Sequence, residues 1–265
     1  MTERFEMMEA LPGVYHIRDA MGVCCTLIVG ETDTLLWDTG YGLFDLAAFI
    51  APYVRGELHV VLSHAHHDHA CGHQWFRNVR IHKDDLPLCA RYTGRVNRKR
   101  QLGRALSLGL IGDGYDSKRY LSADPAAILP LQTMEYDLGG LTVRLLPVPG
   151  HTPGSLAAYI PERTLLLTAD SWNPTTWLFF PDSLPLKTYT RAMQPLRELN
   201  AEHALCSHDF TLHRMDRVRA YIDGLTAETF AAAVPTPVPP YTDIHTFACH
   251  PEPGTTFVFN SDKRE

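Results

Sequence analysis

The chain has 265 residues, of which 45% are hydrophobic and 20% charged, so it can bury a large core and is neither disordered nor fibrous. The formal net charge of −6 argues against a protein that wraps a nucleic acid through its overall field. No apolar run approaches the roughly 20 residues that span a bilayer, and the N-terminal segment lacks the pattern of a signal peptide. The six cysteines include no Cys-x-x-Cys pair, and this usage is typical of free thiols in a reducing compartment. We therefore expect a cytoplasmic protein without a membrane or nucleic-acid partner.

The first third of the chain is rich in strand signals. Short segments of β-branched and aromatic residues, separated by turn residues, predict strands at 13–18, 24–30 and 34–40. Apolar residues at helical spacing predict a helix at 45–54. The apolar run 58–63 predicts a buried strand that leads directly into a histidine-rich segment.

Residues 84–135 have a different character. Helix-like stretches are interrupted by glycines and carry many basic residues, which predicts an inserted helical cap. The most basic part is the stretch 91–104, with Arg91, Arg95, Arg98, Lys99, Arg100 and Arg104. A solvated helix face is the favoured interpretation of this stretch. The alternative is that one of its arginines binds a substrate carboxylate or phosphate.

The second half returns to a strand pattern. Strands are predicted at 141–151, 155–160, 164–170 and 203–209, and helices at 187–199 and about 214–232. The proline-rich segment 234–241 can form neither a helix nor a central strand. We expect a single domain over residues 1–265, with a proline-rich tail from about 234 and helices covering packed sheets.

Four of the predicted strands lead into a residue that can bind a metal: His64, His151, Asp170 and His208. The first of them opens a cluster in which His64, His66, Asp68 and His69 lie within six residues. Residues two apart in an extended loop point the same way, so His64 and His66 can bind one ion while Asp68 and His69 face a second. A lone histidine at a strand end is more often an ordinary polar residue, but a cluster this dense indicates a metal site.

The residue types indicate which metals fit. Neutral imidazoles and carboxylates suit zinc, with manganese and iron as competitors, whereas a set of thiolates would indicate a closed structural site. Two ions about 3.5 to 4 Å apart need a bridging group, and one carboxylate can give an oxygen to each ion. Asp170 is the candidate bridge.

The same residues resemble those of the metallo-β-lactamase-fold hydrolases. The shared features are the Asp-Thr-Gly turn at 38–40, the His-x-His-x-Asp-His run at 64–69, the Gly-His-Thr-Pro-Gly-Ser segment around His151, and the strands leading to Asp170 and His208, in the family's order. The resemblance implies an α/β fold, an αββα sandwich of two similar halves, with a dinuclear metal site at one edge between the sheets.

The resemblance also implies a role for each residue. His64, His66 and His151 would hold the first metal, Asp68, His69 and His208 the second, and Asp170 would bridge them. Asp38 would orient the histidine run through hydrogen bonds. The alternative is that Asp38 is an ordinary turn residue.

Departures from the family's branches narrow the choice. Two-zinc β-lactamases commonly have cysteine at the position of Asp170, and flavodiiron relatives have glutamate at the position of His66. The tail does not look like the helical domain of glyoxalase II enzymes, which share the ligand set. The chain is thus similar to the glyoxalase II and lactonase-like branch and is not expected to be a true β-lactamase.

The implied reaction is hydrolysis of an ester, thioester or lactone of a small molecule by hydroxide held between two divalent ions, most simply zinc, with manganese or iron as alternatives. Asp68 and Asp170 are the expected catalytic carboxylates, with Asp68 passing a proton to the leaving group. The aromatic residues Trp172, Trp177, Phe179 and Phe180 are candidates for a substrate pocket, with core packing as the alternative.

Three other interpretations stay open at this stage. A phosphodiesterase can use the same pair of metals, and an iron oxidoreductase of the persulfide dioxygenase type uses one redox-active ion. The third is a non-catalytic metal-binding module. Degenerate members of the family usually lose some of the metal ligands, whereas all seven are present here. The role of His73 and the oligomeric state, with a homodimer as one possibility, are also left open.

Overall fold

The computed structural model describes residues 4–264. The chain divides into two compact units, Met1–Arg144 and Leu145–Glu265. Among the described residues, no helix combines the length and the apolar character needed to cross a bilayer.

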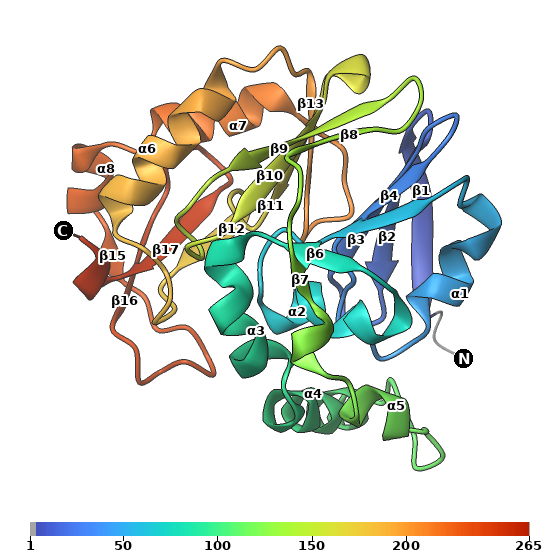
Figure 1. Ribbon diagram of the computed structural model, residues 1–265. Helices are drawn as coiled ribbons and strands as arrows, with labels where there is room; N and C mark the ends of the chain where they lie inside the picture. The colour runs from blue at the N-terminus through green and yellow to red at the C-terminus, as the bar shows by residue number, and fades with distance from the viewer. Residues whose placement is uncertain (1–3, 265) are drawn as a thin grey trace. The chain divides into compact units, whose positions relative to one another are not determined.

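The first unit contains a seven-stranded sheet in the order β1-β2-β3-β4-β5-β6-β7 (Figure 1). Its strands are β1 (Phe5–Leu11), β2 (Val14–Asp19), β3 (Cys24–Val29), β4 (Thr34–Trp37), β5 (Leu58–Val61), β6 (Val79–Ile81) and β7 (Leu129–Pro130). Strands β1 to β4 pair antiparallel and β4 to β7 pair parallel. The strands predicted at 13–18, 24–30 and 34–40 are therefore present, whereas β1 was not predicted.

The parallel pairing of β4 and β5 positions the histidine run. Trp37 pairs with Val61, so the residues after both strands emerge at the same edge of the sheet. The turn that begins at Asp38 and the loop that carries His64 thus start side by side. All of β4 is buried, as are Val60 and Val61 at the end of β5 that leads to the histidine run, as expected of the interior of a covered parallel sheet.

The helices of the first unit are short. They are α1 (Leu46–Ile50), α2 (His67–Ala70), α3 (Leu86–Thr93), α4 (Arg95–Ser107) and α5 (Lys118–Leu121). The predicted helix at 45–54 is shorter than expected, because a 3-10 turn (Ala51–Tyr53) that contains Pro52 follows α1 directly. Helices α3, α4 and α5 lie together within the predicted cap, as Figure 1 shows in green.

The basic stretch of the cap is not simply a solvated face. The side chain of Arg98 is fully buried. Its guanidinium donates to the Thr93 carbonyl at 2.6 Å and to Gln74 Oε1 at 3.1 Å, and it lies 4.7 Å from the centre of the Tyr120 ring. Neutral acceptors and an aromatic face therefore replace water around this cation.

The second unit contains most of a six-stranded sheet and all of a four-stranded one. The six-stranded sheet has the order β14-β13-β11-β10-β9-β8 and the four-stranded sheet the order β12-β17-β16-β15. The first comprises β8 (Glu135–Asp137), β9 (Thr142–Pro147), β10 (Leu156–Ile160), β11 (Leu165–Ala169), β13 (His203–Cys206) and β14 (His213–Arg214). The second comprises β12 (Thr175–Leu178), β15 (Val234–Pro235), β16 (Thr246–Cys249) and β17 (Thr256–Asn260).

Helices α6 (Leu186–Arg197), α7 (Met215–Asp223) and α8 (Ala227–Ala231) complete this unit. The helix predicted at about 214–232 is two helices, and the break falls at Gly224. A Cβ atom at Gly224 would lie 1.8 Å from the Pro251 carbonyl oxygen, so the chain passes too close there for any side chain. Strands β16 and β17 lie in the tail, where no regular structure was predicted, and Pro235 is in the edge strand β15. The limits of a single domain stay a prediction.

Candidate metal centre

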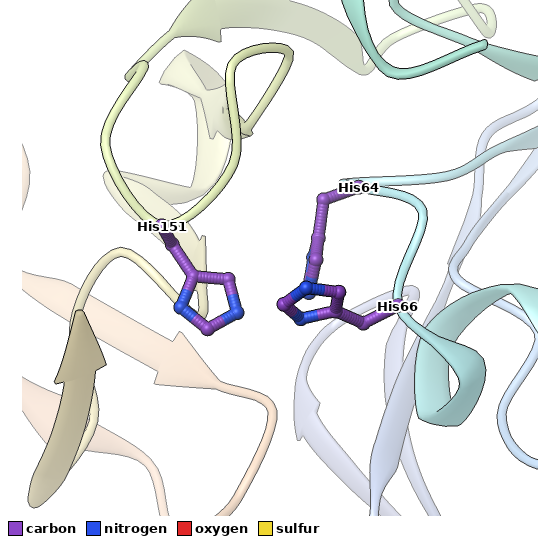
Figure 2. Close-up of side chains that lie close together, drawn as sticks. All are labelled: His64, His66 and His151. Atoms are coloured by element: carbon purple, nitrogen blue, oxygen red, sulfur yellow. The ribbon is translucent and has the colours of Figure 1, made fainter. Parts of the chain in front are cut away.

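The first unit holds four of the predicted ligands, and we call His64, His66, Asp68 and His69 the first-unit set. His64 and His66 lie in the loop after β5, and Asp68 and His69 belong to α2. The three imidazoles are at least 96% buried. Ligand atoms of His64 and His66 lie within 4.8 Å of each other, as do those of His64 and His69 and those of Asp68 and His69. Figure 2 shows the rings of His64 and His66 on this loop.

Asp38 contacts this set directly. Its carboxylate is fully buried and accepts hydrogen bonds from the Ser63 amide at 2.7 Å, the Ser63 hydroxyl at 2.8 Å and His69 Nδ1 at 2.9 Å. Because the Ser63 hydroxyl gives its proton to Asp38, its oxygen accepts from His64 Nδ1 at 3.0 Å. These contacts place the proton of both imidazoles on Nδ1 and leave the Nε2 lone pair available to a metal.

The rest of the Asp-Thr-Gly turn also contacts the run. The backbone amide and the hydroxyl of Thr39 both donate to the His69 carbonyl at 2.8 Å. Asp38 has a φ of 67°, a left-handed conformation that aspartate tolerates better than most residues. The turn therefore fixes both the side chain and the backbone of His69.

The second unit holds the other three predicted ligands, and we call His151, Asp170 and His208 the second-unit set. They follow β9, β11 and β13, and His151 is the third ring labelled in Figure 2. His151 Nε2 lies 3.4 Å from Asp170 Oδ2, and His208 Nε2 lies 3.1 Å from Asp170 Oδ1. The Asp170 carboxylate is thus the common neighbour of both imidazoles.

The geometry of the second-unit set also selects a tautomer. His151 Nδ1 lies 2.7 Å from the Trp177 carbonyl oxygen, which can only accept, so this nitrogen carries the proton. The lone pair of His151 therefore lies on Nε2, on the side of Asp170. His208 is the most accessible of the set, with 37% of its side chain exposed.

Asn173 was not predicted and connects two members of the second-unit set. Its side chain is 98% buried, its Nδ2 donates to Asp170 Oδ1 at 3.2 Å, and its Oδ1 accepts from the His208 amide at 3.2 Å. The only signal in the sequence is an asparagine three residues after Asp170. That signal is too weak to predict a contact with a residue 35 positions away.

The donor chemistry of both sets fits divalent metal ions. Each set combines imidazole Nε2 atoms with carboxylate oxygens, and neither includes a thiolate. Three of the imidazoles, those of His64, His69 and His151, have Nδ1 bound to an oxygen that orients the ring. Such outer hydrogen bonds accompany metal-binding histidines. The clusters resemble the ligands of a dinuclear site, and the assignment of each ligand stays a prediction.

His73 makes contacts that account for its position without a metal. Its Nε2 lies 3.1 Å from the Asp124 carbonyl oxygen, and its Nδ1 lies 2.9 Å from the Ala70 carbonyl oxygen and 3.2 Å from an Arg98 nitrogen. Protein groups therefore surround both ring nitrogens. Burial, together with the charge of Arg98, lowers the pKa of His73 to about 4, in agreement with a neutral ring.

Asp19 contacts the residue that follows the Asp-Thr-Gly turn, Tyr41. Its carboxylate is buried and accepts from the backbone amides of Met21, Val23 and Tyr41, at 2.9, 3.2 and 3.1 Å. Burial raises the pKa of this carboxyl group to about 6, against the lowering effect of these three hydrogen bonds.

The four aromatic residues proposed for a substrate pocket differ in exposure. Trp172 and Phe179 are fully buried in hydrophobic clusters, whereas Trp177 and Phe180 are half-buried and pack against Ala248 and Val258. Contact of any of them with a substrate stays a prediction.

Comparisons with known proteins agree on the family. A family model described as the metallo-beta-lactamase superfamily matches residues 18–208. No curated protein sequence shows a significant match.

Solved structures are similar over most of the chain. A metallo-beta-lactamase family protein from Thermus thermophilus is 21% identical, with a TM-score of 0.57 over 84% of this chain and 81% of that one. A beta-lactamase domain protein from Burkholderia ambifaria is 19% identical, with a TM-score of 0.62 over 85% and 73%. A sec-alkylsulfatase from Pseudomonas sp. is 18% identical, with a TM-score of 0.59 over 83% of this chain and only 40% of the sulfatase. The predicted α/β metallo-β-lactamase fold is confirmed, and the branch is not resolved by similarities this distant.

Proposed function

The chain belongs to the metallo-β-lactamase superfamily, and we propose that it is a metal-dependent hydrolase that cleaves an ester, thioester or lactone bond of a small molecule. The observation that carries this proposal is the pair of ligand sets, in which the buried His64, His69 and His151 present Nε2. Outer hydrogen bonds from Asp38, Ser63 and the Trp177 carbonyl fix that orientation.

We propose that both sets bind one pair of ions. In this arrangement His64, His66 and His151 hold the first ion, Asp68, His69 and His208 hold the second, and Asp170 bridges them. The contacts of the Asp170 carboxylate with both His151 and His208 support the bridging role. Zinc suits this donor set best, and manganese and iron also accept it.

Divalent ions bound there would polarise a carbonyl oxygen and lower the pKa of a bound water from 15.7 to about 7. The protein's own residues do the rest. Asp38 and Asn173 orient His69 and Asp170 through hydrogen bonds, and such preorganised groups reduce the reorganisation that a reaction requires. Asp68, which has 15% of its side chain exposed, is the residue that we propose passes a proton to a leaving alkoxide or thiolate.

The proposal is tested by measuring metal content and activity on the same purified sample. The substrates are a lactone, a thioester, a simple ester and a phosphodiester, with an alkyl sulfate added because of the similarity to a sec-alkylsulfatase. We expect close to two zinc or manganese ions per chain, and turnover of one of the first three substrates that a chelator abolishes.

Other outcomes separate the alternatives. Turnover of only the phosphodiester or the sulfate would show that the enzyme cleaves a different bond from the one proposed, while the proposed metal centre would still hold. One iron per chain with oxygen consumption would favour an oxidoreductase. A stoichiometry of zero after metal-replete refolding would contradict the proposal altogether.

A further inference from the structure

Helix α4 is strongly basic. Its sequence, RVNRKRQLGRALS, has five basic residues and no acidic one, in a chain whose net charge is −6. The basic residues are Arg95, Arg98, Lys99, Arg100 and Arg104. Arg98 is buried and satisfied by neutral acceptors, and the other four are exposed.

Arg100 and Arg104 are four residues apart, so they lie one turn apart on the same face of the helix. Within residues 4–264, no ion pair joins either guanidinium to a carboxylate. Like charges at this spacing repel each other. An anion bound between them would remove that repulsion.

This face contacts the part of the molecule that holds the first-unit set. Arg104 Nη1 donates to the Tyr41 hydroxyl at 3.3 Å. The Tyr41 ring, in turn, lies edge-on to the imidazole of His67, with ring centres 5.3 Å apart. His67 is the residue between the proposed ligands His66 and Asp68.

Arg100 lies one helical turn before Arg104 on this face, and both side chains are exposed to solvent. Tyr41 links Arg104 to the loop that carries the proposed ligands, and Arg100 is its neighbour along the helix.

We propose that Arg100 and Arg104 form a binding site for an anionic group of the substrate, a carboxylate, sulfate or phosphate, on the part of the substrate remote from the bond that is cleaved. Guanidinium groups bind such oxyanions through paired, charge-assisted hydrogen bonds. Tyr41 holds the Arg104 guanidinium beside the ligand loop. This inference rests on the proposed hydrolase function and adds to it the charge of the substrate.

The partner expected is a small molecule and not a nucleic acid. A nucleic-acid surface needs a row of phosphate contacts, and here the two arginines belong to one face of a single helix of 13 residues. The position beside the ligand loop also favours a group that belongs to the substrate.

The test compares two double variants with the same change in charge. R100Q/R104Q removes the proposed site, whereas K99Q/K118Q removes two exposed lysines from α4 and from the nearby α5. Binding of acetate, sulfate and inorganic phosphate to the metal-loaded protein is measured by calorimetry, and the three anions distinguish the possible groups. We expect R100Q/R104Q to bind the preferred anion at least roughly tenfold more weakly, and K99Q/K118Q to bind it like the wild type.

Activity provides a second measurement. A p-nitrophenyl ester with a terminal carboxylate is compared with a neutral ester of the same length. The ratio of the kcat/KM value of the anionic ester to that of the neutral ester should fall by about tenfold in R100Q/R104Q and stay at the wild-type value in K99Q/K118Q. R104K keeps the charge but loses the planar guanidinium, so it should lower this ratio less than R100Q/R104Q does.

The outcomes separate the inference from the proposed function. Equal anion binding in the wild type and R100Q/R104Q, or equal loss in both double variants, would overturn the arginine site even if esters are cleaved. Arginine-dependent anion binding without cleavage of any ester, thioester or lactone would support the anion-binding site but contradict the proposed hydrolase function. Tight binding of a single-stranded oligonucleotide that both double variants weaken equally would show a general basic surface instead.

Discussion

The two ligand sets are built in opposite ways. The four residues of the first-unit set lie within the six positions 64–69, so one loop and one short helix position all four side chains. The second-unit set is distributed from residue 151 to residue 208, and its three side chains meet only because β9, β11 and β13 belong to one sheet. The first set therefore depends on local backbone conformation and the second on strand pairing.

The supporting contacts differ as well. In the first unit, the histidines are oriented by Asp38 and, through it, by the Ser63 hydroxyl. In the second unit, the Trp177 carbonyl orients His151, and the neutral side-chain amide of Asn173 contacts Asp170 and the His208 backbone. The first set should thus be sensitive to the loss or neutralisation of a carboxylate, and the second to changes in packing.

The largest effect is expected at Asp170, the only carboxylate of the second-unit set. Asp170→Ala removes the common neighbour of His151 and His208 and should reduce metal content below two ions per chain. Catalysis should fall by about three orders of magnitude or more, because several kcal/mol of transition-state stabilisation would be lost. Elemental analysis and kcat/KM measure this, with the exposed Asp243→Ala as the control.

Asp170→Cys sharpens the same test. A thiolate is a good ligand for one zinc ion but places a single sulfur differently from two carboxylate oxygens. This variant should keep one ion tightly and the second loosely. Full occupancy and near wild-type turnover in Asp170→Ala would show that the bridge lies elsewhere.

The second effect concerns pH and the first unit. Asp19 has its pKa raised from 3.8 to about 6, so the folded protein retains a proton that the unfolded chain releases. The free energy of unfolding should therefore fall as the pH rises from about 4 to about 6, by about 3 kcal/mol at roughly 1.4 kcal/mol per pKa unit.

Urea unfolding of the metal-free wild type and of Asp19→Asn measures this contribution. The variant cannot titrate, so its stability relative to the wild type should increase across that pH range. A constant difference between the two proteins from pH 4 to pH 7 would contradict the raised pKa of Asp19.

The third effect is expected for Asp38→Asn. Asparagine tolerates the left-handed backbone at this position, but its amide group meets donors where the carboxylate accepts three hydrogen bonds. Metal affinity should fall by roughly 10- to 100-fold, as on loss of other outer partners of ligand histidines. Competition with a chelator measures it against the exposed Asp113→Asn. An unchanged affinity would mean that Asp38 only shapes the turn.

The smallest effect is expected for Asn173→Ala, which removes the contacts with Asp170 and the His208 amide. Because strand pairing still holds both ligands, metal affinity should fall by about tenfold only. Asn200→Ala, at an exposed position of the same unit, serves as the control. A loss larger than that of Asp38→Asn would show that the second unit depends on a single supporting side chain at least as much as the first does.

The sequence by itself predicted the elements whose signals are local. The strands at 13–18 and 24–30 and the helix at 187–199 were found because alternation and helical spacing reach over only a few residues. The histidine run was recognised for the same reason, since its ligands are neighbours in the chain. The family followed from these motifs and their order.

Tertiary structure decided what depends on distant residues. Strands β16 and β17, Asn173 and the burial of Arg98 could not be predicted, because each depends on a partner far along the chain or on packing that composition does not encode. Strand pairing likewise determined that His151 and His208 meet at Asp170. A contact between residues many positions apart is fixed only when the backbone between them has folded, and no local pattern carries that information.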